Sequence, residues 1–157
     1  MDYWQIQDYL EGLLPPRAPE LAAMEAYAKE RDFPIIGPVS GQLCYLVARL
    51  CGATRVFELG SGFGYSTAWF AQAVTDNLAD GAPAHAQDAV VHHTVWDDAL
   101  SAQARTHIAA MGFGDLVKFH IGEAVEALTR SDGPFDLIFM DIDKQGYPGA
   151  IGEIQRK

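Results

Sequence analysis

The sequence has few basic residues and no hydrophobic run long enough to span a bilayer. Among its 157 residues, 11 lysines and arginines stand against 21 aspartates and glutamates, which gives a net charge of −10. Nucleic acids and anionic membranes bind basic surfaces, so this balance argues against both as partners. The first residues include acids where a signal peptide has basic residues. We therefore expect a cytoplasmic protein.

Metal-ligating residues are also scarce. The two cysteines, Cys44 and Cys51, stand seven residues apart in an apolar helical stretch, a separation too long for a disulfide. We expect both to be reduced and to lie in the core. His92 and His93 are neighbours on a predicted strand, so their side chains point to opposite faces and cannot chelate one metal. No zinc site is expected.

The first third of the sequence has helical periodicity. It predicts helices over residues 2–14, 19–31 and 41–50, with Ser40 as the N-cap of the third. The first helix carries an apolar stripe that starts at Tyr3 and ends at Leu10. We expect this stripe to pack on the body of the domain or on the partner of a homodimer, and a substrate lid is the alternative.

Beyond residue 53 the pattern alternates between apolar strands and amphipathic helices. Strands are predicted over residues 54–59, 89–96, 116–121 and 134–142. Helices are predicted over residues 65–78, 97–112, 123–130 and from 147 on, and residues 79–88 form a loop. This order predicts an α/β fold, with a Rossmann-like parallel sheet covered by helices on both faces. We expect one domain, with N-terminal helices over 1–53 and an α/β core over 54–157.

Polar or glycine-rich motifs follow each predicted strand. They read "GSGFG", "WDD", "GEA" and "DIDK" in chain order. Ligands of parallel α/β sheets bind outside the carboxyl ends of the strands, where these four motifs would meet. The sequence therefore predicts one ligand site built from all four.

The glycine loop after the first strand indicates the kind of ligand. Its glycines are Gly60, Gly62 and Gly64, and Tyr65 stands where a dinucleotide fingerprint needs its last glycine. The spacing thus disfavours a nicotinamide cofactor, and no phosphate-binding P-loop is present. Glu58, at the end of the strand, would repel a pyrophosphate but suits a ligand with an ammonium group.

Two segments carry a resemblance to a known family. "VFELGSGFGYSTAWFA" resembles motif I of the class I S-adenosylmethionine-dependent methyltransferases, in the "ELGxxxGYST" form of the catechol and caffeoyl-CoA O-methyltransferase-like family. "FDLIFMDIDKQGYP" resembles that family's "FDLIFIDADKxxY". The resemblance runs from about residue 19 to the end of the sequence. It implies a methyltransferase fold and transfer of a methyl group from S-adenosylmethionine to a hydroxyl of a small catechol-like phenol.

The resemblance also implies the cofactor site. The methionine end of the cofactor would be lined or approached by Val39, Ser40, Glu58, Gly60, Tyr65 and Ser66, with Gly62 and Gly64 keeping the loop open. Trp96 would stack on the adenine, and Glu123 and Ala124 of "GEA" would lie beside it. For Glu123, a helix-start acid without contact to the cofactor is an equal alternative.

One position departs from the family pattern. Val95 stands where the family has an acid that binds the ribose hydroxyls, and valine cannot accept those hydrogen bonds. Either Asp97 takes this role or the ribose is held less tightly.

The fourth motif would carry the chemistry. A carboxylate at the end of an apolar strand is costly without a partner, and a divalent cation such as Mg²⁺ is one such partner for Asp141. In the family the aspartate at this position binds the metal, the lysine matching Lys144 is the general base, and the tyrosine matching Tyr147 lies near the cofactor. A metal that chelates two neighbouring hydroxyls would lower the pKa of the phenol and orient its oxygen.

The family's remaining metal ligands, an Asp-Asn pair, follow a further strand that this sequence does not contain. We therefore expect that the C-terminal strands are missing, that Asp141 alone holds metal weakly, and that these 157 residues show little transferase activity. Two alternatives stay open: a metal-independent methyltransferase, and a non-catalytic remnant that binds only the cofactor or a partner chain.

Overall fold

The computed structural model describes residues 3–81 and 88–157. The described chain opens with three helices, α1 (Tyr3–Gly12), α2 (Pro19–Glu30) and α3 (Gly37–Leu50). Strands and helices then alternate: β1 (Arg55–Leu59), α4 (Tyr65–Ala79), β2 (Val90–Val95), α5 (Asp98–Ala110), β3 (Val117–Ile121), α6 (Ala124–Arg130) and β4 (Leu137–Met140). A short 3-10 helix, η2 (Lys144–Gly146), leads into α7 (Tyr147–Ile154).

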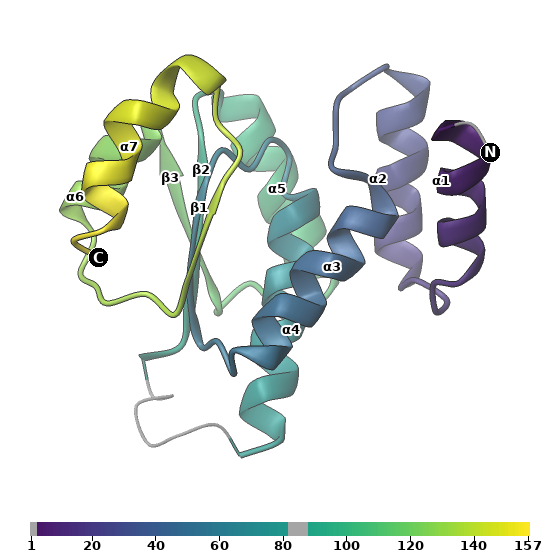
Figure 1. The fold of residues 1–157 in the computed structure, drawn as a ribbon, viewed down its shortest axis with the longest axis horizontal. Coiled ribbons are helices and arrows are strands. Elements are labelled where there is room, and N and C mark those ends of the chain that lie inside the picture. The colour runs from purple at the N-terminus through teal and green to yellow at the C-terminus, as the bar shows by residue number, and fades with distance from the viewer. Residues whose placement is uncertain (1–2, 82–87) are drawn as a thin grey trace.

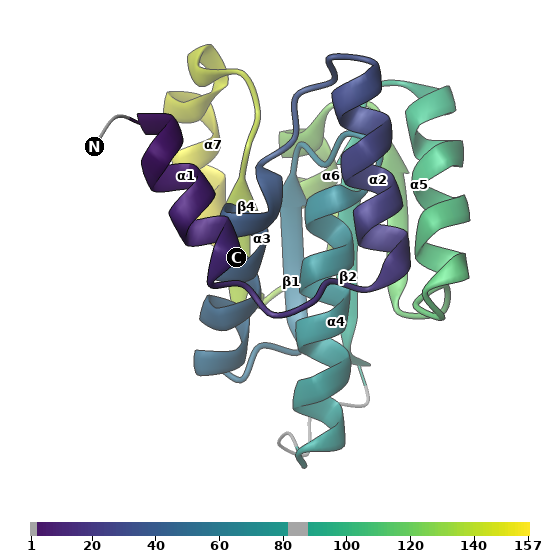
Figure 2. The ribbon, with the colours of Figure 1, turned by 90° about the vertical axis from the view of Figure 1, so that its right-hand side faces the viewer.

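The strands form one parallel sheet in the order β3-β2-β1-β4. The helices α3, α4 and α5 cover one face of this sheet, while α6 and α7 cover the other (Figure 1). Figure 2 shows α2, α4 and α5 packed side by side over the first face. The predicted α/β fold, with a parallel sheet covered on both sides, is therefore confirmed.

Each face of the sheet has its own hydrophobic core. The larger core fills the space between the sheet and α2–α5 and includes Met24, Val56 and Phe70, all almost fully buried. The smaller core lies under α6 and α7 and is built on Phe57 and Leu59. Alternate residues of β1 thus point to opposite cores, and all of its side chains beyond Arg55 are buried.

The two adjacent histidines of β2 follow the same alternation. His92 contacts His120 and Phe57 on one face, while His93 contacts Thr67 of α4 on the other. The prediction that they point to opposite faces is confirmed.

Two local predictions were wrong. Helix α3 begins at Gly37, so Ser40 is an exposed residue inside the helix and not its N-cap. The misleading signal was Pro38, which is tolerated in the first turn of a helix because that turn has no need of its N–H. Both cysteines are free, as predicted, but Cys51 is exposed at the end of α3 and only Cys44 is partly buried.

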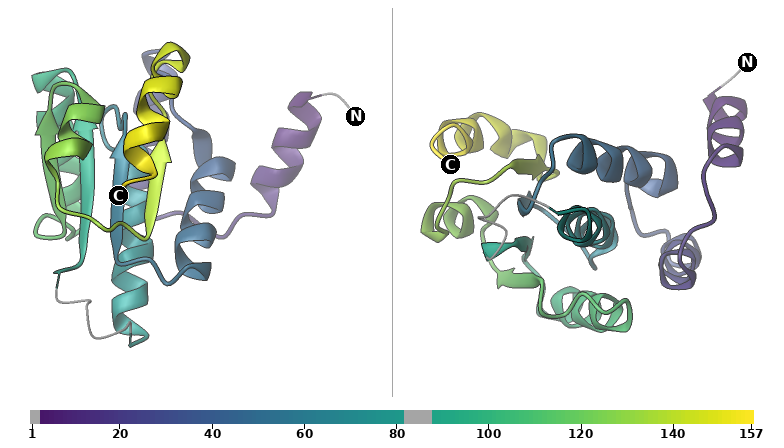
Figure 3. Two further views of the ribbon diagram at one scale, coloured as in Figure 1. Left: turned by 60° about the vertical axis from the view of Figure 1, so that its left-hand side comes forward. Right: turned by 90° about the horizontal axis from the view of Figure 1, so that it is seen from below.

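Helix α1 lies at the margin of the molecule, where it contacts α3 (Figure 3). Ile6 and Leu10 of its apolar stripe are exposed, so the body leaves this part of the stripe uncovered. A homodimer or a lid formed by α1 stays a prediction. In the part of the chain that the structure describes, no helix combines the length and apolar character needed to cross a membrane.

Candidate functional site

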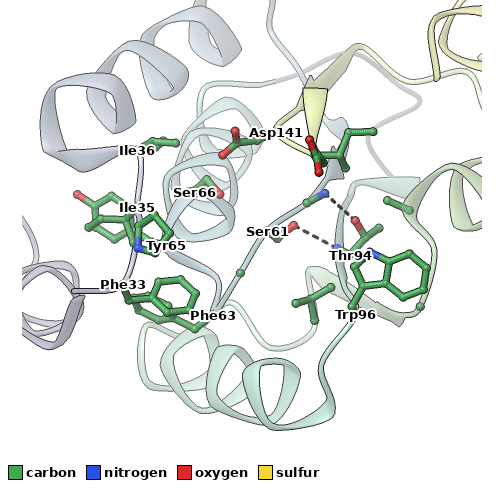
Figure 4. Close-up of a pocket in the computed structure, with 18 residues that line it drawn as sticks. Phe33, Ile35, Ile36, Ser61, Phe63, Tyr65, Ser66, Thr94, Trp96 and Asp141 are labelled. Carbon is green, nitrogen blue, oxygen red and sulfur yellow. Dashed lines mark hydrogen bonds between the residues drawn. The ribbon is translucent and has the colours of Figure 1, made fainter. Parts of the chain in front are cut away.

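A cleft of about 640 Å³ lies at the carboxyl ends of β1, β2 and β4. Its floor is the glycine loop between β1 and α4. One wall is the apolar segment from Phe33 to Ile36, and Trp96 stands across the cleft from it, with Asp141 at a third side (Figure 4). All four predicted strand-end motifs contribute residues to this cleft or directly border it, as a site at a parallel sheet edge requires.

Thr94, near the end of β2, fixes the shape of the glycine loop. Its hydroxyl accepts a hydrogen bond from the Gly60 N–H at 2.9 Å and donates to the Glu58 carbonyl at 2.8 Å. Its backbone carbonyl accepts from the Ser61 N–H at 2.9 Å, and its N–H donates to the Ser61 hydroxyl at 3.1 Å. Three hydrogen bonds thus tie the loop to β2, and a fourth ties β2 to the end of β1.

Two glycines of the loop are required by close packing. Gly60 has φ +88°, and a Cβ there would lie 2.5 Å from the Asp141 carbonyl oxygen. Gly64 has φ +92°, and its Cβ would lie 3.0 Å from Ala104 Cβ of α5. Gly60 and Gly62 line the cleft, whereas Gly64 allows α4 and α5 to approach each other and does not line it.

Glu58 lies beneath the cleft floor and is fully buried. Its Oε2 accepts a hydrogen bond of 2.5 Å from the Thr67 hydroxyl. Within the described residues, Glu58 Oε1 has no hydrogen-bond partner. Burial raises the pKa of Glu58 to about 7, and the nearby Asp141 charge adds to this, while the hydroxyls of Ser66, Thr67 and Ser61 oppose it. A buried carboxylate with a free oxygen is a strong candidate to receive a cationic group of a ligand.

The raised pKa of Glu58 predicts how stability depends on pH. The folded chain keeps a proton on Glu58 up to about pH 7, whereas the unfolded chain releases this proton near pH 4.5. The protonated carboxyl therefore contributes fully to the free energy of unfolding below pH 4.5, and this contribution is lost as pH rises through 7. The shift corresponds to at most about 3 kcal/mol. Urea unfolding of the wild type and of Glu58→Gln from pH 4 to pH 8 measures it, since glutamine does not titrate. Parallel pH profiles of the two proteins would contradict the assignment.

Tyr65 joins the cleft to α2. Its hydroxyl donates to Glu25 at 2.8 Å, and Glu25 forms an ion pair with Arg17 at 2.8 Å. Burial raises the pKa of Tyr65. Tyr65 and its neighbour Ser66 line the cleft, and their predicted contact with a cofactor stays a prediction.

Several predicted cofactor residues do not line the cleft. Val39 and Ser40 lie inside α3. Asp97 is the N-cap of α5 and accepts from the Leu100 N–H at 2.8 Å, and Glu123 caps α6 in the same way. For Glu123 the structure agrees with the helix-start alternative. Ala124 and Trp96 do line the cleft, and Trp96 is 72% exposed.

The fourth motif, "DIDK", is more exposed to solvent than its position after an apolar strand suggested. Asp141 lines the cleft but is exposed, so the argument that burial makes a partner necessary was wrong for this carboxylate. Lys144 is exposed on η2, and the Tyr147 hydroxyl donates to the Met140 carbonyl at 3.4 Å. Across residues 3–81 and 88–157, no three His, Cys, Asp or Glu side chains are grouped as a metal ion would require.

Sequence reasoning missed the apolar wall of the cleft. Phe33, Ile35 and Ile36 lie between the second and third predicted helices, where no site residue was predicted, yet they line the cleft beside the glycine loop (Figure 4). A possible signal was the density of apolar residues in a segment that also contains prolines, which is unusual for a solvated loop.

Comparison with known proteins agrees with this geometry. The family model described as "Methyltransferase domain" matches residues 57–151. A catechol O-methyltransferase of Niastella koreensis is 31% identical over 148 residues, which are 90% of this chain and 62% of that protein. A catechol O-methyltransferase of Mycobacterium tuberculosis is 29% identical over 153 residues, 93% of this chain and 63% of that protein. The chain therefore spans less than two thirds of the length of these relatives.

Solved structures also resemble this fold. The O-methyltransferase TomG of Streptomyces achromogenes, whose structure was determined in complex with SAM, matches with a TM-score of 0.80 and 26% identity. The match covers 97% of this chain and 66% of TomG. A methyltransferase of Geobacter sulfurreducens matches with a TM-score of 0.79 and 29% identity, over 99% of this chain and 75% of that one.

Proposed function

This chain belongs to the methyltransferase domain family, and we propose that it binds S-adenosylmethionine in the cleft and serves methyl transfer to a hydroxyl oxygen of a small catechol-like phenol. The observation that carries the proposal is the free, buried Oε1 of Glu58 beneath a glycine loop. S-Adenosylmethionine carries a positively charged ammonium group, which can pair with this carboxylate oxygen. The names of the two curated relatives support the oxygen acceptor and its catechol class.

The residues in and beneath the cleft divide into two groups that suit the two ends of this cofactor. Ser61 and Ser66 of the cleft lining, with Glu58 buried beneath the floor, would receive the amino-acid end, since one buried acid and two hydroxyls gather there. Val95 and Trp96 would contact the adenosine end through apolar surface. The ribose hydroxyls are the part of the cofactor that these residues fit least, because Val95 has no hydrogen-bond acceptor and the carboxylate of Asp97 already caps α5.

The chemistry requires an acceptor oxygen in line with the methyl group. The cofactor supplies an electrophilic methyl group when it is bound. Asp141 borders the cleft next to Gly60, and we assign it to orienting the acceptor hydroxyl. Lys144, three residues further on, would accept the hydroxyl proton as the oxygen attacks. The described residues do not fit a metal site, so no step is assigned to Mg²⁺, and a metal-independent methyltransferase remains the second candidate.

Calorimetric titration of the 157-residue chain tests the proposal. We expect binding of S-adenosylmethionine with one site, and incubation with catechol then measures transfer with and without Mg²⁺. Binding unaffected by Mg²⁺, together with transfer, would favour the metal-independent enzyme. Binding without transfer in either condition would favour a cofactor-binding remnant, and no binding at all would overturn the proposal.

Trp96 gives a further prediction for the adenosine end. Replacing Trp96 with Ala should weaken S-adenosylmethionine binding about 2- to 12-fold, because aromatic stacking contributes roughly 0.5–1.5 kcal/mol. Titration calorimetry measures the loss. The control is Tyr9→Ala, since Tyr9 is exposed on α1 and is not among the residues that line the cleft. Unchanged affinity of Trp96→Ala would remove Trp96 from the cofactor site.

A further inference from the structure

Three polar side chains form a buried chain of hydrogen bonds behind the cleft. The Thr67 hydroxyl lies 2.5 Å from Glu58 Oε2 and 3.0 Å from His93 Nδ1. All three residues are fully buried. They come from β1, α4 and β2, and the parallel pairing that sets Phe57 against His92 brings Glu58 beside His93. This series of hydrogen bonds begins beneath the cleft floor and ends in the core.

When Glu58 is ionised, only one placement of the hydrogens is consistent with the hydrogen bonds among these three side chains. The Thr67 hydroxyl has a single hydrogen, and an ionised carboxylate can only accept, so Thr67 donates to Glu58 Oε2. Thr67 must then accept at its contact with His93, which places the ring hydrogen on Nδ1. His93 Nε2, which has no partner among the described residues, then carries no hydrogen and needs no acceptor.

The surroundings of His93 keep its ring neutral. Burial lowers the pKa of His93 to about 3, and the charges of Arg105 and His120 act in the same direction. Phe119 packs against the ring at 5.1 Å between centroids. A ring that is held in place and does not ionise is suited to fix the orientation of a hydroxyl.

We propose that His93 is a positioning residue, which acts through the Thr67 hydroxyl to hold the Glu58 carboxylate with Oε1 directed toward a ligand's ammonium group. The inference rests on the proposed function, because it needs a cationic ligand in the cleft. His93 itself does not touch the ligand. Its contribution is to keep Oε2 engaged, so that Oε1 is the oxygen left for the ligand.

The test compares two ligands that differ in the amino-acid end. S-Adenosylhomocysteine carries the ammonium group, and 5′-methylthioadenosine has the same adenosine part without it. His93→Leu should weaken S-adenosylhomocysteine binding about 3- to 10-fold, the value of one hydrogen bond, and leave methylthioadenosine binding unchanged. His93→Asn, whose amide can donate from a position close to that of Nδ1, should restore affinity to within about twofold of wild type.

A second pair of variants keeps the test valid if His93→Leu does not fold. Thr67→Val removes the hydroxyl at constant shape and should show the same ligand-selective loss, while Thr67→Ser keeps the hydroxyl and should bind like the wild type. Equal losses for both ligands, or an unrescued His93→Asn, would overturn the role of His93. A wild-type chain that binds neither ligand would overturn the proposed function, and this inference with it.

Discussion

Replacing Glu58 with Gln is expected to weaken S-adenosylhomocysteine binding by about 30-fold or more at pH 8. At this pH the wild-type Glu58 is above its pKa of about 7 and is ionised. Loss of one partner of a buried, hydrogen-bonded charge pair costs about 2–5 kcal/mol. Glutamine has the shape of glutamate but not its charge, so the loss reports on the carboxylate. Titration calorimetry measures the affinity of both proteins for S-adenosylhomocysteine.

The matched control is the same substitution at Glu123. The family resemblance left Glu123 either beside the adenine or as a helix-start acid, and its side chain accepts from the Glu126 N–H at 2.6 Å and caps α6. We expect Glu123→Gln to bind S-adenosylhomocysteine within about twofold of wild type, because the amide oxygen still caps the helix. Methylthioadenosine provides the second control, and its affinity should not change in Glu58→Gln. A similar loss for both ligands would mean that the substitution disturbs the cleft as a whole.

The affinity of the wild type for S-adenosylhomocysteine should also depend on pH, in a direction that the ionisation of Glu58 determines. Below pH 7 Glu58 takes up a proton and loses the charge that attracts an ammonium group. Affinity for S-adenosylhomocysteine should therefore fall as pH decreases from 8 to 6, while affinity for methylthioadenosine stays level. In Glu58→Gln this pH dependence should vanish.

The order of strands and helices along the chain and the place of the cleft could be predicted because they depend on local patterns. Apolar runs mark the strands of a buried parallel sheet, and such sheets bind ligands at one edge. Glu58 and Gly60 were predicted for this reason, since each lies at the end of β1 or just beyond it, whereas Ser66 was implied by the family resemblance. Their contact with a cofactor stays a prediction. Segments of ten residues carry enough information for such elements.

The remainder of the site depends on contacts between distant segments, which no local pattern records. Phe33 meets the glycine loop only because α2 packs over α4. His93 lies 26 residues from Thr67 along the sequence, and the packing of α4 on β2 brings them together. Asp141 was expected to need a metal because its strand is apolar, yet it lies past the end of β4, where the chain is open to solvent.

Replacing Gly60 with Ala is expected to destabilise the fold by about 2–5 kcal/mol. A non-glycine residue in the left-handed region costs about 1–2 kcal/mol, and Gly60 has φ +88°. The new Cβ would also lie 2.5 Å from the Asp141 carbonyl oxygen, which is backbone and cannot rotate away. Relief requires β1 and the end of β4 to separate, at an overpacking cost of about 1–3 kcal/mol. Urea unfolding measures the change in the free energy of unfolding.

Gly112→Ala separates the two causes. Gly112 has φ +80°, but a Cβ there would have no atom within 4 Å. This variant should lose only the backbone contribution, about 1–2 kcal/mol, with an unchanged denaturant slope. It should also bind S-adenosylhomocysteine normally, whereas Gly60→Ala should bind weakly even where it remains folded, because the displaced Asp141 borders the cleft. Equal destabilisation of the two variants would show that the contact between Gly60 and Asp141 is loose enough to accept a methyl group.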